Sequence, residues 1–167
     1  KNKPGVYVLN VDENEIKSEV VIKLSKYLEK KYMTSVVTIP GKLEEDMLDL
    51  PESERSEYMR EFLVDVSGLN QLIKNTFKIL GLITFYTIKG GKEVHAWSLP
   101  AGKQALEAAE VVHTDFAKHF IKAEVINVND LLKIGGWKEA GQTGKLRLEG
   151  KDYKVNDRDV IEFKVGN

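Results

Sequence analysis

The first half of the chain contains only two short runs with the character of parallel β-strands, and a helical pattern separates them. Residues 5–9 (Gly-Val-Tyr-Val-Leu) and 35–39 (Ser-Val-Val-Thr-Ile) are apolar or β-branched, as is typical of strands buried on both faces. The segment between them has an acidic start at residues 12–15 and a basic end at residues 30 and 31, which suits the helix dipole. Its apolar stripe consists of Ile16, Val20, Leu24, Tyr27 and Leu28. The pattern predicts a βαβ unit with two parallel strands.

Two further helices are expected before residue 81. Pro51 suits the start of a helix that carries Tyr58, Met59, Phe62 and Leu63. A second helical stripe, which Gly81 ends, consists of Leu69, Leu72, Ile73, Thr76, Phe77 and Leu80. A parallel sheet usually has four or more strands, so an α/β domain with two looks incomplete, unless it packs against the rest of the chain. We therefore expect uncovered apolar faces and a strand edge in residues 1–80, which favour self-association.

From residue 81 the pattern changes to short alternating strands around one helix. Strands at 83–88 and 93–99 flank Gly90-Gly91, a pair that tolerates the positive φ angles of a tight hairpin. One helical face follows at Ala105, Ala108, Ala109 and Val112. Further strands are expected over residues 121–128, 145–148, 153–155 and 160–165. This order is that of a β-grasp, ubiquitin-like domain, although composition alone does not select it over another small α+β fold.

The connection after the third of these strands is expected to be mostly irregular. Asn129 and Asp130 would cap a short helical turn over residues 131–134, which Gly135 would end. The stretch 135–144 contains four glycines and is expected to form a loop.

Composition excludes several classes of protein. The chain has 25 Lys and Arg against 26 Asp and Glu, a net charge of −1, so any nucleic acid would be bound by a local patch. It has no Cys, which excludes disulfides, a thiol nucleophile and cysteine-ligated metal centres. No apolar run approaches ~20 residues and no signal-peptide pattern is present. We expect a soluble, cytoplasmic protein without a membrane partner.

Motifs for catalysis are also missing. A P-loop needs a glycine five residues before its Gly-Lys pair and Ser or Thr after it, and no Gly-Lys pair of this chain has either. The five pairs begin at Gly41, Gly91, Gly102, Gly144 and Gly150. His113, Asp115 and His119 are clustered, but Asp115 is expected to cap a turn over 116–120 and His113 to end a helix. No catalytic or metal-binding residue is assigned.

Aromatic and basic residues of the second half suggest a surface for nucleic acid. His95 and Trp97 lie on one side of their expected strand. The helix of a β-grasp covers one sheet face only, so strand side chains on the other face would meet solvent or a partner. The basic residues expected near these two are Lys89, Lys92, Lys118, Lys122 and Arg147, with Trp137 also close. Residues 81–167 carry 13 Lys and Arg against 12 Asp and Glu, so an ordinary mixed surface is the alternative.

Several blocks resemble one family. Asn10-Val11-Asp12-Glu13, closing a strand after Asn2-Lys3-Pro4, resembles the Asn-x-x-Glu element of the YchF/Obg-like ATPases, which stands where other GTPases carry Asn-Lys-x-Asp. Five blocks of the second half look like the C-terminal TGS domain of that family. They are residues 81–87, 92–94 together with 96–97, 113–116, 123–125 and 148–153. The resemblance covers nearly the whole chain in the right order.

The resemblance implies a fragment of a ribosome-associated P-loop ATPase or GTPase. Residues 1–80 would be the end of its nucleotide-binding domain and residues 81–167 its TGS domain, a β-grasp that contacts RNA or the ribosome. ATP or GTP with Mg²⁺ would bind the full-length parent, whereas this fragment, which lacks the P-loop, would be inactive and bind none alone. The alternative is a self-contained β-grasp module that binds RNA or protein without hydrolysing nucleotide. A P-loop encoded upstream would decide between them.

The resemblance also implies residues for base recognition. Asn10 would hydrogen-bond the base edge, and Val11 would add a backbone contact. Glu13 stands where an Asp carboxylate otherwise accepts two hydrogen bonds from guanine, so adenine would compete better. The loop that is Ser-Ala-Lys-Leu-Glu in the family is Pro-Gly-Lys-Leu-Glu here, with Gly41 and Lys42 at the base-contacting positions.

Overall fold

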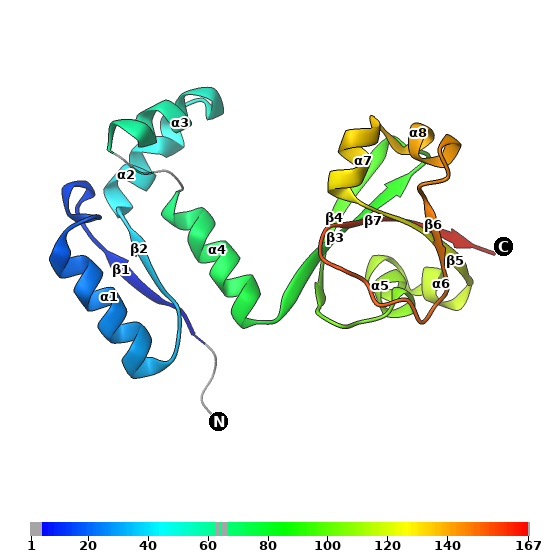
Figure 1. Cartoon of the computed structure of the whole chain (residues 1–167), viewed down its shortest axis with the longest axis horizontal. Helices are drawn as coiled ribbons and strands as arrows, with labels where there is room; N and C mark the ends of the chain where they lie inside the picture. Colours follow the sequence, from blue (N-terminus) through cyan, green and yellow to red (C-terminus); the bar gives the residue numbers. More distant parts are fainter. Residues whose placement is uncertain (1–4, 63, 65–66, 167) are drawn as a thin grey trace. The chain divides into compact units, whose positions relative to one another are not determined.

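The chain folds into two compact units, Lys1–Leu80 and Gly81–Asn167 (Figure 1). The computed structural model describes residues 5–62, 64 and 67–166. None of the helices in this described part is long and apolar enough to cross a membrane.

The first unit contains the expected βαβ arrangement. Strands β1 (Tyr7–Asn10) and β2 (Val36–Ile39) pair in parallel, with Tyr7 opposite Val36 and Asn10 opposite Ile39. Between them lie the 3₁₀ turn η1 (Glu13–Glu15) and the helix α1 (Glu19–Tyr32). Helix α1 begins where Ser18 Oγ accepts a hydrogen bond from the Val21 amide at 3.2 Å.

The buried face of α1 differs from the predicted stripe. Val21 is 8 % exposed, whereas Val20 is 75 % exposed, and Leu24 and Tyr27 are exposed as well. The prediction failed because α1 starts at Glu19, after Ile16, and because four of the residues from Val20 to Leu24 are apolar, which leaves the helical phase ambiguous.

Strand β1 is not buried on both faces, contrary to expectation. Tyr7 is 41 % and Val8 is 44 % exposed, because the described sheet of this unit has two strands and cannot enclose either face. Uncovered apolar side chains are thus present, as the strand count predicted. Self-association through them stays a prediction.

The rest of the first unit is helical. It comprises α2 (Gly41–Asp46), the 3₁₀ turn η2 (Met47–Asp49), α3 (Glu52–Glu61) and α4 (Gly68–Ile79). Helix α3 follows Pro51 and carries half-buried Tyr58 and Met59, while Leu63 lies outside the described residues. Helices α1 and α4 both contact β2. A Cβ on Gly68 would lie 2.9 Å from Ile39 Cγ1, so this close approach of α4 requires glycine.

The second unit is built on a five-stranded sheet of order β4-β3-β7-β5-β6. Strand β3 pairs with β7 in parallel, and the other neighbours are antiparallel. The strands are β3 (Leu82–Lys89), β4 (Glu93–Pro100), β5 (Phe120–Asn127), β6 (Arg147–Glu149) and β7 (Asp159–Val165). Gly90 and Gly91 turn the β3–β4 hairpin with φ angles of 58° and 73°, as expected. The strand expected at residues 153–155 is reduced to one bridge, between Lys154 and Gln104.

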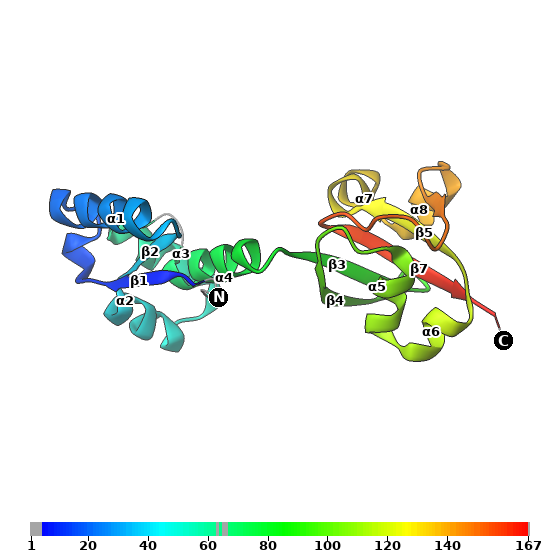
Figure 2. The same ribbon diagram turned by 90° about the horizontal axis from the view of Figure 1, so that it is seen from below.

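Helices lie on both sides of this sheet, with α5 and α6 on one side and α7 and α8 on the other (Figures 1 and 2). They are α5 (Ala105–Val112), α6 (Thr114–Lys118), α7 (Val128–Ile134) and α8 (Trp137–Gln142). On the α5 side the core includes Phe85, Leu99, Ala108, Val125 and Ile161. On the α7 side a smaller core contains Ile88, Ile126, Ala140 and Val160.

This second core corrects three expectations. The sheet is covered on both faces, because Trp137 and Ala140 of α8 pack on Ile88 and its neighbours. Residues 135–144 are therefore not an irregular loop, although Gly135, with φ of 99°, does end α7. The cap of α7 is Asn127, whose Oδ1 accepts from the Asn129 amide at 3.0 Å, and not Asn129 or Asp130.

We predict that residues 81–167 fold without residues 1–80, because this unit has its own sheet and two cores. Both tryptophans of the chain, Trp97 and Trp137, belong to it, so urea unfolding followed by tryptophan fluorescence reports this unit alone. A chain of residues 81–167 should show one cooperative transition with the midpoint of the full chain. A broad transition without cooperativity would contradict this division of the chain.

Candidate functional site

The ends of the parallel strands bring together three of the expected base-binding residues. Asn10 ends β1, and its side-chain Oδ1 accepts a hydrogen bond from the Gly41 amide at 3.0 Å. The Val11 amide donates to the Ile39 carbonyl at 3.1 Å, which continues the strand pairing into this corner. A Cβ on Gly41 would lie 2.7 Å from Asn10 Oδ1, so a larger residue would push this contact apart. The bond leaves the Asn10 amide nitrogen as a donor for a ligand.

Lys42 and Glu13 are placed differently. The Lys42 ammonium lies 2.9 Å from Asp46 and 3.3 Å from Glu45, and hydrogen bonds to these carboxylates, that to Asp46 first, raise the pKa of Lys42. Glu13 is half-buried in η1 and lines a small cavity of about 200 Å³ with Glu61 and Phe62 of the α3 end. Gly41 lines another cavity, of about 620 Å³. The structure therefore does not bring Glu13 into the cavity of Gly41.

Sequence reasoning missed the contact that anchors α2, the helix that begins at Gly41. Both carboxylate oxygens of Glu44 accept from Ser67 Oγ at 2.9 Å, and Oε1 also accepts from the Leu69 amide at 3.3 Å. Glu44 thus joins α2 to the start of α4. The sequence signal was Ser67-Gly68 directly before a helical stripe, because Ser commonly caps the start of a helix. The first backbone amides of such a helix have no partner within it and can donate to an acceptor.

In the second unit the expected nucleic-acid surface is divided. Lys89 and Lys92 are exposed at the β3–β4 hairpin, and His95 is exposed on β4 with Nε2 2.9 Å from Glu93 Oε1. That hydrogen bond lowers the pKa of Glu93. Arg147 lies on β6, at the opposite edge of the sheet. Lys122, half-buried on β5, lies between the two edges.

Trp97 is a packing residue in this structure. Its ring is half-buried against the core on the α5 side, and its indole N–H donates to Thr87 Oγ1 at 2.9 Å. The side of β4 that carries His95 and Trp97 is therefore the side covered by α5, not a bare sheet face. Bases cannot stack on the buried part of the ring.

The arrangement at residues 113–119 is structural. His113 Nδ1 accepts from the Asp115 amide at 3.2 Å, so His113 caps α6 and the expected cap at Asp115 is wrong. Among the described residues no group of three or more His, Cys, Asp or Glu side chains could hold a metal ion.

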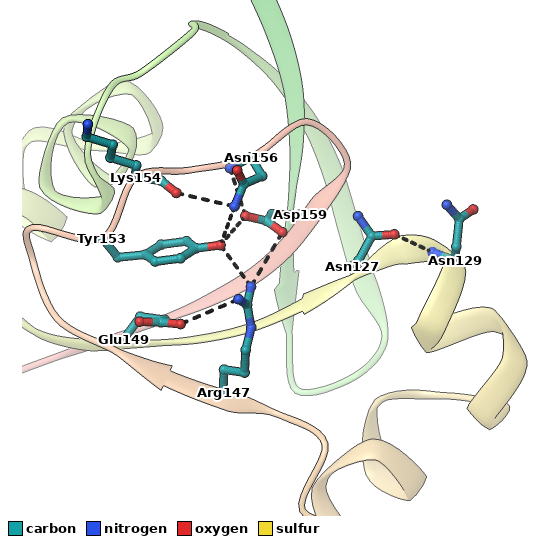
Figure 3. Close-up of polar contacts among 8 residues, drawn as sticks. All are labelled: Asn127, Asn129, Arg147, Glu149, Tyr153, Lys154, Asn156 and Asp159. Atoms are coloured by element: carbon teal, nitrogen blue, oxygen red, sulfur yellow. Dashed lines mark hydrogen bonds and ion pairs between the residues drawn. The ribbon is translucent and has the colours of Figure 1, made fainter.

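A polar cluster around the buried Asp159, formed by Arg147, Tyr153, Asn156 and Asp159, was not expected (Figure 3). Asp159 is 2 % exposed, and its Oδ2 accepts from the Tyr153 hydroxyl at 2.7 Å and from the Asn156 amide at 2.9 Å. The Tyr153 oxygen in turn accepts from Arg147 Nη2 at 2.8 Å and from Asn156 Nδ2 at 2.9 Å. We call these four residues the Asp159 cluster.

Interactions within the Asp159 cluster raise the pKa values of Tyr153 and Arg147. Burial, then the hydrogen bond to Asp159, raise the pKa of Tyr153, so its phenol stays a donor. Burial opposes the charge of Arg147, but the hydrogen bond to Tyr153 and the charges of Asp159 and Glu149 outweigh it and raise the pKa of Arg147. The cluster therefore holds a permanent cation beside a buried anion.

Comparison with known proteins identifies the family. A family model named YchF-GTPase_C, with the description "Protein of unknown function (DUF933)", matches residues 82–166. The chain belongs to the YchF family. The family expectation drawn from the sequence is thereby confirmed.

Curated YchF relatives match both units of the chain. The "Ribosome-binding ATPase YchF" of Buchnera aphidicola from Schizaphis graminum is 40 % identical over 161 residues, which cover 96 % of this chain and 44 % of that protein. The protein of the same name from Bacillus subtilis is 40 % identical over 167 residues, covering 98 % and 45 %. This chain thus spans less than half the length of these relatives.

Solved structures agree. The YchF GTPase of Schizosaccharomyces pombe superposes with a TM-score of 0.84 at 26 % identity, covering 97 % of this chain and 43 % of that one. A GTP-binding protein from Pyrococcus horikoshii, at 20 % identity and a TM-score of 0.68, shares the fold.

We predict that Trp97→Ala destabilises the second unit by about 3 kcal/mol through lost packing, and that Trp97→Phe costs about 1 kcal/mol through the lost hydrogen bond to Thr87. His95→Ala, an exposed neighbour on the same strand, should change stability by less than about 0.5 kcal/mol. Urea unfolding followed by the fluorescence of Trp137 measures all three. If Trp97→Ala were as neutral as His95→Ala, the ring would be available for stacking after all.

Proposed function

We propose that this chain is part of a ribosome-associated P-loop ATPase or GTPase of the YchF type. In this proposal residues 1–80 complete the nucleotide-binding domain, and residues 81–167 form a β-grasp TGS domain. The curated relatives named ribosome-binding ATPases support the overall activity, and the strand order β4-β3-β7-β5-β6 around α5 supports the β-grasp assignment. A ribosomal partner implies action in the cytoplasm.

The hydrogen bond from the Gly41 amide to Asn10 Oδ1 carries the proposal for the first unit. It fixes the side chain at the carboxyl ends of two parallel strands, which is where ligands of open α/β sheets bind. With Oδ1 occupied, Asn10 presents Nδ2 to an acceptor on the base edge. Val11 and the Gly41–Lys42 segment contribute backbone beside it. The ammonium of Lys42 has no assigned ligand role, because Asp46 and Glu45 hold it.

Glu13 is assigned to base selection because of its place in the Asn-x-x-Glu element, although it lines a different cavity from Gly41. An Asp at this position would accept two hydrogen bonds from guanine, and the longer Glu side chain is displaced from that geometry, so guanine loses its advantage over adenine. Binding of the phosphates and Mg²⁺ of ATP or GTP is assigned to parts of the longer protein other than residues 1–167.

The nucleotide preference of the longer protein tests this assignment. Glu13→Asp should raise the ratio of kcat/KM for GTP to that for ATP about tenfold, the gain of roughly one hydrogen bond to a charged group. Glu15→Asp, the same change at an exposed position of the same 3₁₀ turn, is the control and should leave the ratio unchanged. An unaltered ratio in Glu13→Asp, with normal hydrolysis, would remove Glu13 from the base site.

For the second unit we assign the ribosome or RNA contact to the hairpin residues Lys89, Lys92 and His95. Lys122 is half-buried on β5, which β7 separates from β3, and is not part of this assignment. All three assigned residues are exposed, and the positive charges of Lys89 and Lys92 support the assignment, since phosphates that bind such residues release counterions. Trp97 supports this surface by packing, and Arg147 belongs to the opposite edge of the sheet.

Co-sedimentation with ribosomes tests this contact. The double variant Lys89→Glu, Lys92→Glu should bind at least about tenfold more weakly, and the difference should shrink as salt is raised. The double variant Lys138→Glu, Lys151→Glu makes the same charge change at exposed positions elsewhere on the unit and should bind normally. Equal losses in both variants would indicate a general effect of charge instead of a contact at the hairpin.

A further inference from the structure

A cavity of about 670 Å³ opens beside the Asp159 cluster, away from the β3–β4 hairpin. Its walls come from the end of β5, the starts of β6 and β7, and α7. Ile126 and Ile134 form an apolar wall, and the other lining residues are polar or charged. A volume of this size accommodates a small organic ligand.

The cavity offers positive charge at its rim. Lys145 lines it and has no carboxylate within 4 Å among the described residues. Lys133 also lines it and is paired with Asp130 at 3.8 Å, near the limit of an ion pair. Arg147 adds a third cation, held in place by Tyr153. These residues suit a group with negative charge, such as a phosphate.

The cavity also offers an oxygen acceptor that receives no hydrogen bond from the described residues. Asp159 Oδ2 is occupied by Tyr153 and Asn156, but Oδ1 lies 3.8 Å from Arg147 Nη2, which is too far for a hydrogen bond. Asp159 lines the cavity and, in Figure 3, lies between Asn156 and Asn127. This oxygen is accessible, and a ligand that donates a hydrogen bond can replace the water there.

Phosphate alone would satisfy the lysines but would be repelled by Asp159. A ligand that joins a phosphate to a hydroxyl group satisfies both. We propose that this cavity binds one ribonucleotide unit, with its phosphate at Lys145 and Lys133, the ribose 2′-hydroxyl donating to Asp159 Oδ1, and the base against Ile126 and Ile134. The unit comes either from a free ribonucleotide or from single-stranded RNA. In the RNA case the inference rests on the RNA contact proposed above and names a second place for it.

NMR titration of the full chain with 5′-AMP, its 2′-deoxy counterpart, and short adenylate oligomers of RNA and DNA tests the site. The side-chain amide signals of Asn127 and Asn156, which line the cavity, should shift during titration with the ribonucleotides. The ribo forms should bind about tenfold more tightly than the deoxy forms, because only they carry the 2′-hydroxyl that Asp159 accepts. An RNA oligomer that binds about tenfold more tightly than AMP identifies RNA as the source, and equal affinities identify the free nucleotide.

Lys145→Gln is the main variant, because its side chain is exposed and outside the Asp159 cluster. It should raise the Kd about tenfold and make the salt dependence shallower by about one phosphate contact. Lys151→Gln, an exposed lysine that does not line the cavity, should bind as the unaltered chain does. The proposal is overturned if ribo and deoxy forms bind equally, if the Asn127 and Asn156 signals do not move, or if both lysine variants lose the same affinity.

The outcome is separable from that of the proposed function. If Lys145→Gln loses nucleotide binding while ribosome co-sedimentation is normal, the cavity is a nucleotide site and the ribosome contact lies elsewhere. If the hairpin variant fails to weaken co-sedimentation while Lys145→Gln still weakens nucleotide binding, the hairpin assignment falls and the cavity assignment stands.

Discussion

The second unit depends on the buried carboxylate of Asp159. A charge that is 2 % exposed is stable only where hydrogen bonds and an opposite charge replace water, and Tyr153, Asn156 and Arg147 supply them. Asp159 begins β7, which lies between β3 and β5 in the sheet. The same carboxylate therefore fixes the start of the middle strand, the turn before it and the edge strand β6.

The turn before β7 shows how tightly this position is held. Arg158 has a φ of 66°, which is unfavourable for a residue other than glycine. Its amide donates to the Thr84 carbonyl at 2.7 Å, and the Thr84 amide donates to Asp157 Oδ1 at 2.9 Å. These bonds to β3 offset the strain and set the parallel pairing of β3 with β7. The same bonds position Asn156 and Asp159, which line the cavity.

Local signals in the sequence predicted much of the fold, and long-range packing explains what they missed. The βαβ unit and the Gly90-Gly91 hairpin follow from neighbouring residues and are present. The buried side of α1 was misjudged because Val20, Val21 and Ile22 are all apolar, so the sequence does not show which of them is buried, and in the structure it is Val21. Helix α8 was missed because the glycines around it outweighed the helical spacing of Trp137 and Ala140.

The candidate sites were also predictable to different degrees, because local motifs are visible in the sequence and long-range packing is not. Asn10 and Gly41 are 31 positions apart, but the parallel strand ends join them, so a motif at each end was sufficient. The Asp159 cluster combines residues of β6, the loop after it and β7, and no motif marks their meeting. Trp97 was predicted as a binding residue but packs against the core. Alternation along β4 predicted which side of the strand carries Trp97, but it could not predict that α5 covers that side.

In both proposed ligand sites a hydrogen bond to a backbone amide anchors the ligand-binding side chain. In each, one atom of a short polar side chain binds a backbone amide and the other atom is left for a ligand. Asn10 Oδ1 holds the Gly41 amide and leaves Nδ2, while Asp159 Oδ2 holds the Asn156 amide and leaves Oδ1. A side chain anchored in this way loses little conformational freedom when the ligand arrives, because the backbone bond has already ordered it. The anchoring bond thus lowers the entropic cost of binding and sets the direction from which the ligand must approach.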